Sequence, residues 1–201
     1  MPGLLLATTN RGKAAEYEAL LKGLDLELVT LDQVGISQAA PEDHPTFEEN
    51  ARSKAEFYSA LSGLITLADD SGLEVDALNG EPGVRSSRYA GEGATDAERV
   101  NFLLNKLRQV SQENRTARFR CVIAVAIPGG NTTTFEGKCE GQIALKPVGD
   151  NGFGYDPIFY LPEYRKTIAE IPSELKNKLS HRGRAAQKAH PFLEKLTSGS
   201  H

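Results

Sequence analysis

Short apolar runs and longer amphipathic segments alternate along this chain. Runs with the length and composition of strands occur at residues 3–7, 26–31, 64–68 and 73–78. Two longer strands, at residues 119–127 and 132–145, are predicted on either side of a Pro-Gly-Gly-Asn turn. Because a hairpin of this kind is antiparallel, the sheet is predicted to be mixed rather than purely parallel.

Helix start signals precede the amphipathic segments. Asn10 is placed to cap the first helix. The Thr-x-x-Glu spacing of a capping box occurs at Thr46–Glu49 and again at Thr95–Glu98, each time ahead of an apolar stripe of helical period. Two more helices are predicted near the C-terminal end. The fold class is therefore α/β, with a central twisted mixed sheet flanked by helices.

Composition and charge narrow the class of protein. The 201 residues, 39% hydrophobic and 25% charged, suit one globular domain of two lobes. A net charge of −4 argues against a general nucleic-acid binder, and no apolar run is long enough to span a membrane. Cys121 and Cys139 are expected to be reduced thiols of a cytoplasmic protein. Residues 198–201 resemble a tag or linker remnant, so the domain is predicted to cover residues 1–197.

The first candidate site is Thr-Thr-Asn-Arg-Gly-Lys, residues 8–13, between a predicted strand and a helix. A helix start offers free backbone N–H groups and the positive end of the helix dipole, which favour phosphate. Lys13 adds a charged donor, although the spacing is not that of a Walker A loop. A plain capped helix with a solvated Lys13 is the alternative interpretation.

Six carboxylates form the second candidate: Glu42, Asp43, Glu48, Glu49, Asp69 and Asp70. Mg²⁺ typically takes one or two protein carboxylates and completes its shell with water and phosphate. Adjacent strand residues point to opposite faces, so Asp69 and Asp70 reach one site only if the strand has ended, which Ser71-Gly72 favours. The alternatives are a turn cap for the aspartates and helix-dipole stabilisation for Glu48 and Glu49.

Glycine-rich and basic segments complete the candidates. Residues 79–94 are predicted to be a long loop, of a length that is usually functional. In the loop 149–156, glycines around Phe153 let the backbone approach a ligand and leave an aromatic face for stacking. Residues 175–184 gather basic groups suited to a polar heterocycle or a phosphate. A Phe153 packed in the core and a solvated basic helix end are the simpler alternatives.

Taken in order, these segments closely resemble the inosine/xanthosine triphosphate pyrophosphatase family. The resemblance covers nearly the whole chain, through LLLATTNRGK, TFEENARSKA, LADDSGLEVDALNGEPGVRSSRYAGE, NGFGYDPIF and LSHRGRA. It implies a two-lobed α/β fold with the active site in the cleft between the lobes, and a homodimer. It also implies Mg²⁺-dependent hydrolysis of non-standard purine nucleoside triphosphates (ITP, dITP, XTP) to the monophosphate and pyrophosphate.

The resemblance assigns roles by position. Asp70 is implied to be the general base and, with Glu42, a ligand of Mg²⁺. Substrate contacts are implied for Thr8, Thr9, Asn10, Arg11, Gly12, Lys13, Ser71, Phe153, Gly154, Tyr155, Asp156, Lys176, His181 and Arg182. Donors from the last three suit the 6-oxo group of hypoxanthine and xanthine, and would be left unpaired by the amino group of adenine.

Two departures from the family pattern leave alternatives open. Thr9 stands where a glycine is frequent, and Ala-Pro-Glu-Asp-His-Pro precedes Thr46 where Glu-Glu-Thr-Gly is commoner. Asp43 or Glu48 could therefore take the place of Glu42, and a metal role for Asp69 stays open. Two other functions are also weighed: a Maf-like pyrophosphatase acting on dTTP, UTP or modified bases, and a nucleotide sensor without turnover. The Ser-His-Arg-Gly and Phe-Gly-Tyr-Asp-Pro segments favour the purine family, and the acidic residues favour catalysis.

Overall fold

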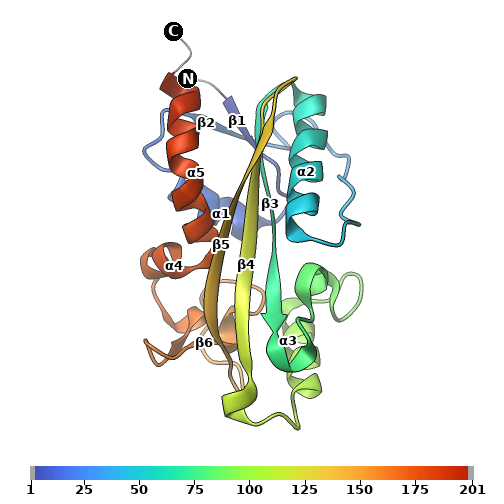
Figure 1. Ribbon diagram of the computed structural model, residues 1–201, viewed down its shortest axis with the longest axis vertical. Coiled ribbons are helices and arrows are strands. Elements are labelled where there is room, and N and C mark those ends of the chain that lie inside the picture. Colours follow the sequence, from blue (N-terminus) through green and yellow to red (C-terminus); the bar gives the residue numbers. More distant parts are fainter. Residues whose placement is uncertain (1–2, 199–201) are drawn as a thin grey trace. The chain divides into compact units, whose positions relative to one another are not determined.

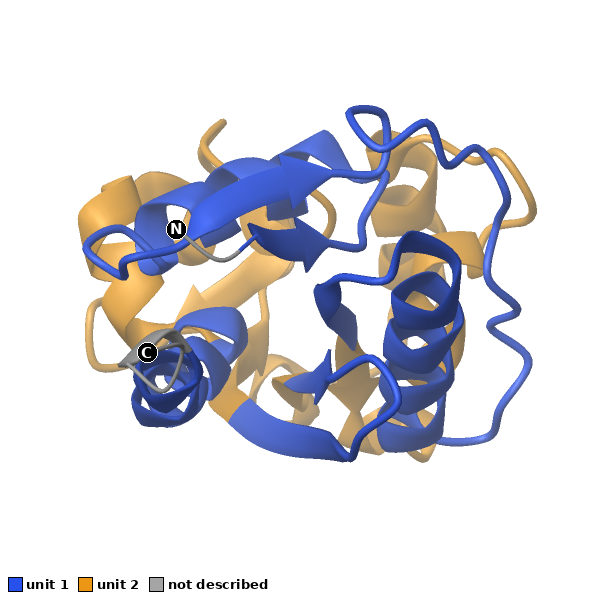
Figure 2. Ribbon diagram, turned by 90° about the horizontal axis from the view of Figure 1, so that it is seen from above, with its two compact units in different colours: residues 1–70, 121–137, 181–201 blue, residues 71–120, 138–180 orange. Residues whose placement is uncertain are grey.

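The structure, a computed structural model, describes residues 3–198. Its chain forms two compact units, coloured separately in Figure 2. Unit 1 comprises residues 1–70, 121–137 and 181–201, and unit 2 comprises residues 71–120 and 138–180. The predicted tag at residues 198–201 lies, apart from Ser198, outside the described residues.

Helices and strands alternate in the first two thirds of the chain (Figure 1). The strands are β1 (Gly3–Leu6), β2 (Glu27–Thr30), β3 (Ile65–Val75), β4 (Thr116–Ala126), β5 (Thr132–Ile143), β6 (Phe159–Leu161) and β7 (Lys166–Thr167). The α-helices are α1 (Arg11–Leu20), α2 (Phe47–Ser62), α3 (Asp96–Lys106), α4 (Ser173–Leu179) and α5 (His181–Ser198). Short 3₁₀ helices include η1 (Asp76–Leu78), η2 (Gly83–Arg88) and η4 (Asp156–Ile158).

The strands form one seven-stranded sheet in the order β2-β1-β3-β4-β5-β6-β7. In unit 1, β1 pairs in parallel with both β2 and β3, so that Leu5 lies opposite Val29 on one side and Thr66 on the other. In unit 2, β6 is antiparallel to both β5 and β7. Parallel and antiparallel pairs thus occur in the same sheet, which confirms the predicted mixed α/β class.

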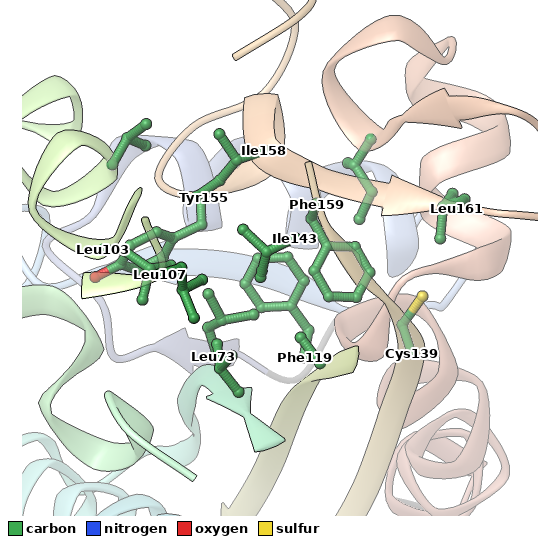
Figure 3. Packing of buried hydrophobic residues seen from close by; sticks show 14 of the residues in the cluster. Leu73, Leu103, Leu107, Phe119, Cys139, Ile143, Tyr155, Ile158, Phe159 and Leu161 are labelled. Atoms are coloured by element: carbon green, nitrogen blue, oxygen red, sulfur yellow. The ribbon is translucent and has the colours of Figure 1, made fainter. Parts of the chain in front are cut away.

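Each unit has its own apolar core. In unit 1, Leu4 and Leu6 of β1 are buried with Tyr17 of α1, and α5 contributes Ala185 and Leu193. In unit 2, the rings of Phe119 and Phe159 lie 4.5 Å apart at the centre of the cluster in Figure 3. Leu103 on the apolar face of α3 and Leu107 just after that helix belong to the same cluster, and so does Tyr155. Tyr155 therefore anchors the glycine-rich loop in the core of unit 2.

The predicted helix caps are confirmed. The Asn10 side chain accepts a hydrogen bond from the N–H of Lys13 at 3.0 Å. Thr46 accepts from the N–H of Glu49 at 3.2 Å, and Thr95 and Glu98 form a complete capping box. These caps satisfy N–H groups that have no partner inside the helix, and so fix where α1, α2 and α3 begin.

Two sequence predictions about the third strand are wrong. It was expected to end at Ala68 and to be followed by a second strand at residues 73–78, but β3 runs without interruption from Ile65 to Val75. The two aspartates stay inside the strand because partners from distant segments offset their charges. The predicted loop 79–94 is also less irregular than expected, because η2 occupies much of it.

The structure also bears on membrane-spanning helices and on the two cysteines. None of the helices that the structure describes is long and apolar enough to cross a membrane. Cys121 and Cys139 are both buried and form no disulfide, as the sequence led us to expect, and one lies in each unit.

Candidate active site

Asp69 and Asp70 point to opposite faces of the sheet because β3 continues through them. Asp69 is only 2% exposed. Its carboxylate lies 3.0 Å from Nζ of Lys13 at the start of α1 and 3.5 Å from the guanidinium of Arg182 at the start of α5. The thiol of Cys121 on β4 donates to the same carboxylate at 3.7 Å. With Glu16, these residues are called the Asp69 cluster below, and all of them belong to unit 1.

Charge balance explains how the Asp69 cluster stays ionised in the interior. Burial acts to raise the pKa of Asp69, but Lys13 and Arg182 outweigh it and hold that pKa far below its usual range. Glu16 accepts a second hydrogen bond from Arg182, at 2.5 Å. Burial also raises the pKa of Cys121 to about 12, so its thiol remains protonated and able to donate. Asp69 is therefore a fixed negative charge that holds α1 and α5 to β3.

Asp70 lies in a different environment on the other face. Its carboxylate accepts a hydrogen bond from the amide of Asn50 at 2.9 Å, and Asn50 in turn bonds the backbone of His44. Burial raises the pKa of Asp70, and the nearby carboxylate of Glu42 adds to the rise. Lys13 and Lys54, the latter paired with Glu42, lower the pKa of Asp70 only in part. Asp70 is thus the carboxylate of the pair that more readily takes up a proton.

Asn50 and Lys54 are functional candidates that the sequence analysis did not single out. They are four residues apart on α2, so both project from one face of the helix. Asn50 contacts Asp70, whereas Lys54 pairs with Glu42 and donates to the backbone carbonyl of Asp69 at 3.1 Å. Their helical spacing within TFEENARSKA was the available signal. We call Glu42, Asn50, Lys54 and Asp70 the Asp70 group.

The Asp70 group fits a single hard cation. Glu42 and Asp70 are close enough for each to raise the electrostatic cost of the other's charge. The described residues contain no group of three or more His, Cys, Asp and Glu side chains arranged to hold a metal. Two carboxylates are nevertheless the protein donor set that Mg²⁺ typically takes when phosphate completes its shell. Of the alternatives to Glu42, Asp43 is exposed and Glu48 is paired with Arg52.

Lys13 links the 8–13 loop to the Asp69 cluster. Its side chain is only 15% exposed and reaches Asp69, which rules out the interpretation of a solvated lysine. Thr8 accepts a hydrogen bond from the N–H of Asn10 at 3.1 Å, which shapes the loop, while Thr9 and Arg11 are exposed. The loop thus brings an ammonium group and the start of a helix to the carboxyl end of β1.

A second cluster lies in unit 2, around the loop 149–156. Phe153 is half-buried, and Nζ of Lys176 lies 4.9 Å from the centre of its ring. Asp156 accepts hydrogen bonds from the N–H of Phe153 at 2.9 Å and from Lys176 at 2.6 Å. Gly152 is required here because a Cβ would lie 2.1 Å from the Asp156 carboxylate, and its φ is +82°. Phe153 is therefore held at the loop rather than packed into the core.

The same loop is fixed from a second direction. Gly154 donates its N–H to the carboxylate of Asp96, the first residue of α3, at 2.6 Å. The buried hydroxyl of Tyr155 donates to the carbonyl of Ser86 at 2.9 Å. Asp96, Phe153, Gly154, Asp156 and Lys176 are called the glycine-loop cluster below.

The predicted site residues are brought together within each unit. In unit 1, Lys13 and Arg182 meet at Asp69, and Glu42 lies near Asp70; His181, buried, begins α5. In unit 2, the predicted residues Phe153, Gly154, Tyr155, Asp156 and Lys176 share one hydrogen-bonded loop. Ser71 is the first residue of unit 2. Paired carboxylates beside a lysine at a strand–helix junction are typical of enzymes that act on phosphate groups.

The comparisons with known proteins identify the class more closely. The chain belongs to the Ham1 family, whose model matches residues 4–192. It is 50% identical over 185 residues to the dITP/XTP pyrophosphatase of Geobacter sulfurreducens, and the aligned segment covers 92% of this chain and 93% of that protein. Its structure matches that of a HAM1 protein from Coxiella burnetii with a TM-score of 0.88 and 42% identity, over 97% of this chain and all of the other. The family resemblance seen in the sequence is confirmed.

Proposed function

We propose that this protein hydrolyses dITP, XTP and ITP to the nucleoside monophosphate and pyrophosphate, and so removes them from the nucleotide pool. The observation that carries the proposal is the pair of buried aspartates on β3. Asp69 is held ionised among cations, and Asp70 is held beside a second carboxylate. Relatives that share about half of their residues with this chain are named dITP/XTP pyrophosphatases, which supports the same activity.

Mg²⁺ is the cofactor that this donor set suits, with Glu42 and Asp70 as its protein ligands. Bound there, the ion would neutralise phosphate charge and relieve the repulsion between the two carboxylates. Glu42→Gln is then expected to raise the Mg²⁺ concentration needed for half-maximal rate several-fold. Glu48→Gln is the matched control, because Glu48 pairs with Arg52 instead. If the control shifts the Mg²⁺ requirement and Glu42→Gln does not, the ligand assignment passes to Glu48.

The side chains of unit 1 suit attack by water at the α-phosphorus. Asp70 accepts a proton from the water while the oxygen of that water bonds to the α-phosphorus. The bond from that phosphorus to the bridging oxygen breaks, and its electron pair leaves with pyrophosphate. Lys13 lies at the start of α1, where an ammonium and free N–H groups stabilise the negative charge of the departing phosphates.

The glycine-loop cluster suits the purine ring. We assign stacking to Phe153, one face of which is already near the ammonium of Lys176. Lys176 and His181 are donors that suit the 6-oxo edge. Arg182 is only 2% exposed and is bonded to Glu16 and Asp69. If Arg182 contacts the base, Arg182→Ala should lower the ratio of kcat/KM for ITP to kcat/KM for ATP. If instead kcat/KM falls equally for both substrates, Arg182 acts only as part of the Asp69 cluster.

A substrate panel tests the proposed activity. Wild-type protein with Mg²⁺ is given ITP, dITP, XTP, ATP, GTP, dTTP and UTP, and pyrophosphate release is measured through a coupled pyrophosphatase. The proposal expects turnover of the first three at rates far above the others. Preference for dTTP or UTP would favour the Maf-like alternative. Tight binding of ITP without pyrophosphate release would favour the sensor.

Assembly and location complete the proposal. On the family resemblance we propose a cytoplasmic homodimer, built from a catalytic domain that covers residues 1–197. Size-exclusion chromatography with light-scattering detection tests the dimer, because light scattering gives the mass of the particle independently of its shape. A mass of one chain at micromolar concentration would contradict it.

A further inference from the structure

Asp96 holds two parts of unit 2 together. One carboxylate oxygen accepts the N–H of Gly154 at 2.6 Å, and the other pairs with Arg99 one turn further along α3. Arg99 also donates to the carbonyl of Ser87 at 2.9 Å and to that of Ala94. The start of α3 is thereby bonded both to the segment before it and to the loop 149–156.

These bonds leave little freedom to the part of the loop that carries Phe153. Gly154 has a φ of +64°, a left-handed conformation that favours glycine, and its N–H donates to Asp96 in that conformation. The N–H of Phe153 is taken by Asp156 and that of Gly154 by Asp96. Both backbone donors next to the ring are thus committed to carboxylates. A ligand therefore meets the ring of Phe153 rather than these two N–H groups.

We propose that Asp96 is a positioning residue for purine binding, which acts through Gly154 by fixing the loop backbone from which the Phe153 ring projects. The inference rests on the proposed function, because it concerns how the base is held. A ring that is fixed before binding loses less entropy when a base stacks on it. The loss of Asp96 therefore weakens binding of every purine substrate and leaves the chemical step at Asp70 almost unchanged.

A purely structural role for Asp96 predicts something different. An acidic residue in the first turn of a helix stabilises the helix dipole whatever else it contacts. Glu98 provides the matched control, because it lies in the same turn and caps α3 through Thr95 without touching the loop. If Asp96 served α3 alone, Asp96→Ala and Glu98→Ala would have the same consequences.

The experiment compares Asp96→Ala, Asp96→Asn and Glu98→Ala in the full chain with ITP and dITP. Asp96→Ala is expected to raise KM about 3- to 10-fold, the range of one hydrogen bond, with kcat within about 2-fold of wild type. Asp96→Asn keeps an oxygen that accepts from Gly154 and is expected to restore most of the wild-type KM. Glu98→Ala is expected to lower the Tm without changing KM.

A readout without substrate separates the possible failures. In a ¹H–¹⁵N spectrum of the free protein, the Gly154 amide is expected to move strongly in Asp96→Ala and little in Glu98→Ala. If the wild-type protein releases no pyrophosphate from ITP or dITP, the proposed function is wrong. The amide shift of Gly154 still tests the contact with Asp96 in that case, because it is measured without substrate. If the wild-type protein is active, two results would overturn the role of Asp96. One is a KM that Asp96→Ala leaves unchanged, and the other is a KM that Glu98→Ala or Asp96→Asn raises as much as Asp96→Ala does.

Discussion

The Asp69 cluster of unit 1 and the Asp96 contacts of unit 2 use carboxylates in opposite ways. In the first, Asp69 meets the charged ends of Lys13 and Arg182 in the interior, at 2% exposure. In the second, Asp96 accepts a backbone N–H, and its side chain is 46% exposed. The Asp69 cluster therefore arranges charge out of water, and the Asp96 contacts arrange the shape of a loop at the surface.

The difference sets how strongly each cluster responds to change. A charge buried with its partners cannot be removed without leaving those partners in a medium that solvates them poorly. A bond to a half-exposed carboxylate can be replaced by a bond to water. Large effects on turnover and stability are therefore expected at the two aspartates of β3, and smaller effects on substrate binding at Asp96.

The largest effect is expected at Asp70. Asp70→Asn removes the proposed base but keeps an oxygen that can accept from Asn50, so turnover of ITP should fall by roughly 10²-fold or more. The Tm should stay the same or rise, because burial raises the pKa of Asp70 and so disfavours its charge in the folded state. Steady-state rates and a melting curve measure both. Turnover at the wild-type rate in the folded variant would show that Asp70 is not the general base.

Asp69 is expected to show the opposite pattern in stability. Asp69→Asn leaves Lys13 and Arg182 without their shared negative charge, and the free energy of unfolding should fall by about 3 kcal/mol. The lower end of the usual range applies because Glu16 still balances Arg182. Urea unfolding of the two asparagine variants side by side is the measurement. Equal stability of both would show that the two faces of β3 are not electrostatically distinct.

Lys13 is expected to affect the distal phosphates. Lys13→Ala should weaken binding of a non-hydrolysable ITP analogue roughly 10- to 100-fold, the worth of a charged hydrogen bond, and binding of IMP much less. Calorimetric titration gives both dissociation constants. Lys22→Ala, an exposed lysine just beyond α1, controls for the change in net charge. Equal losses for the two ligands would place Lys13 away from the leaving group.

Phe153 should give the least selective effect. Phe153→Leu removes a stacking surface worth about 1–3 kcal/mol, so kcat/KM for ITP, dITP, XTP and ATP should fall by a common factor. Phe102→Leu is the control, because Phe102 is an exposed aromatic residue of the same unit that lies outside the loop. A change in the ratio of ITP to ATP would mean that the ring itself takes part in selecting the base.

Local features of the fold were accessible from the sequence. The starts of α1, α2 and α3 follow from Asn10, Thr46 and Thr95, because each cap bonds a backbone N–H only three residues further along. The long hairpin of β4 and β5 follows from alternation and a Pro-Gly turn. The family resemblance rested on motifs of this local kind and pointed to the same class of protein.

The course of β3 was not accessible in the same way. Asp69, Asp70 and Gly72 disfavour a strand by local preference, and the sequence pattern therefore predicts that the strand ends before them. The structure keeps the strand because Lys13 and Arg182 reach Asp69 from positions 56 and 113 residues away. A strand residue's preference is decided by such neighbours as much as by its own chemistry.

The sequence alone therefore determined which residue types could carry the chemistry and where most helices begin, because these depend on side chains a few positions apart. Only the tertiary structure decided that Asp69 is a fixed charge and Asp70 a carboxylate that protonates readily. Both are aspartates in adjacent positions, and their pKa values diverge because Lys13 and Arg182 outweigh burial at Asp69, whereas burial outweighs Lys13 and Lys54 at Asp70 and Glu42 adds to it. Those partners come from other helices and loops, and folding alone brings them to the two faces of one strand.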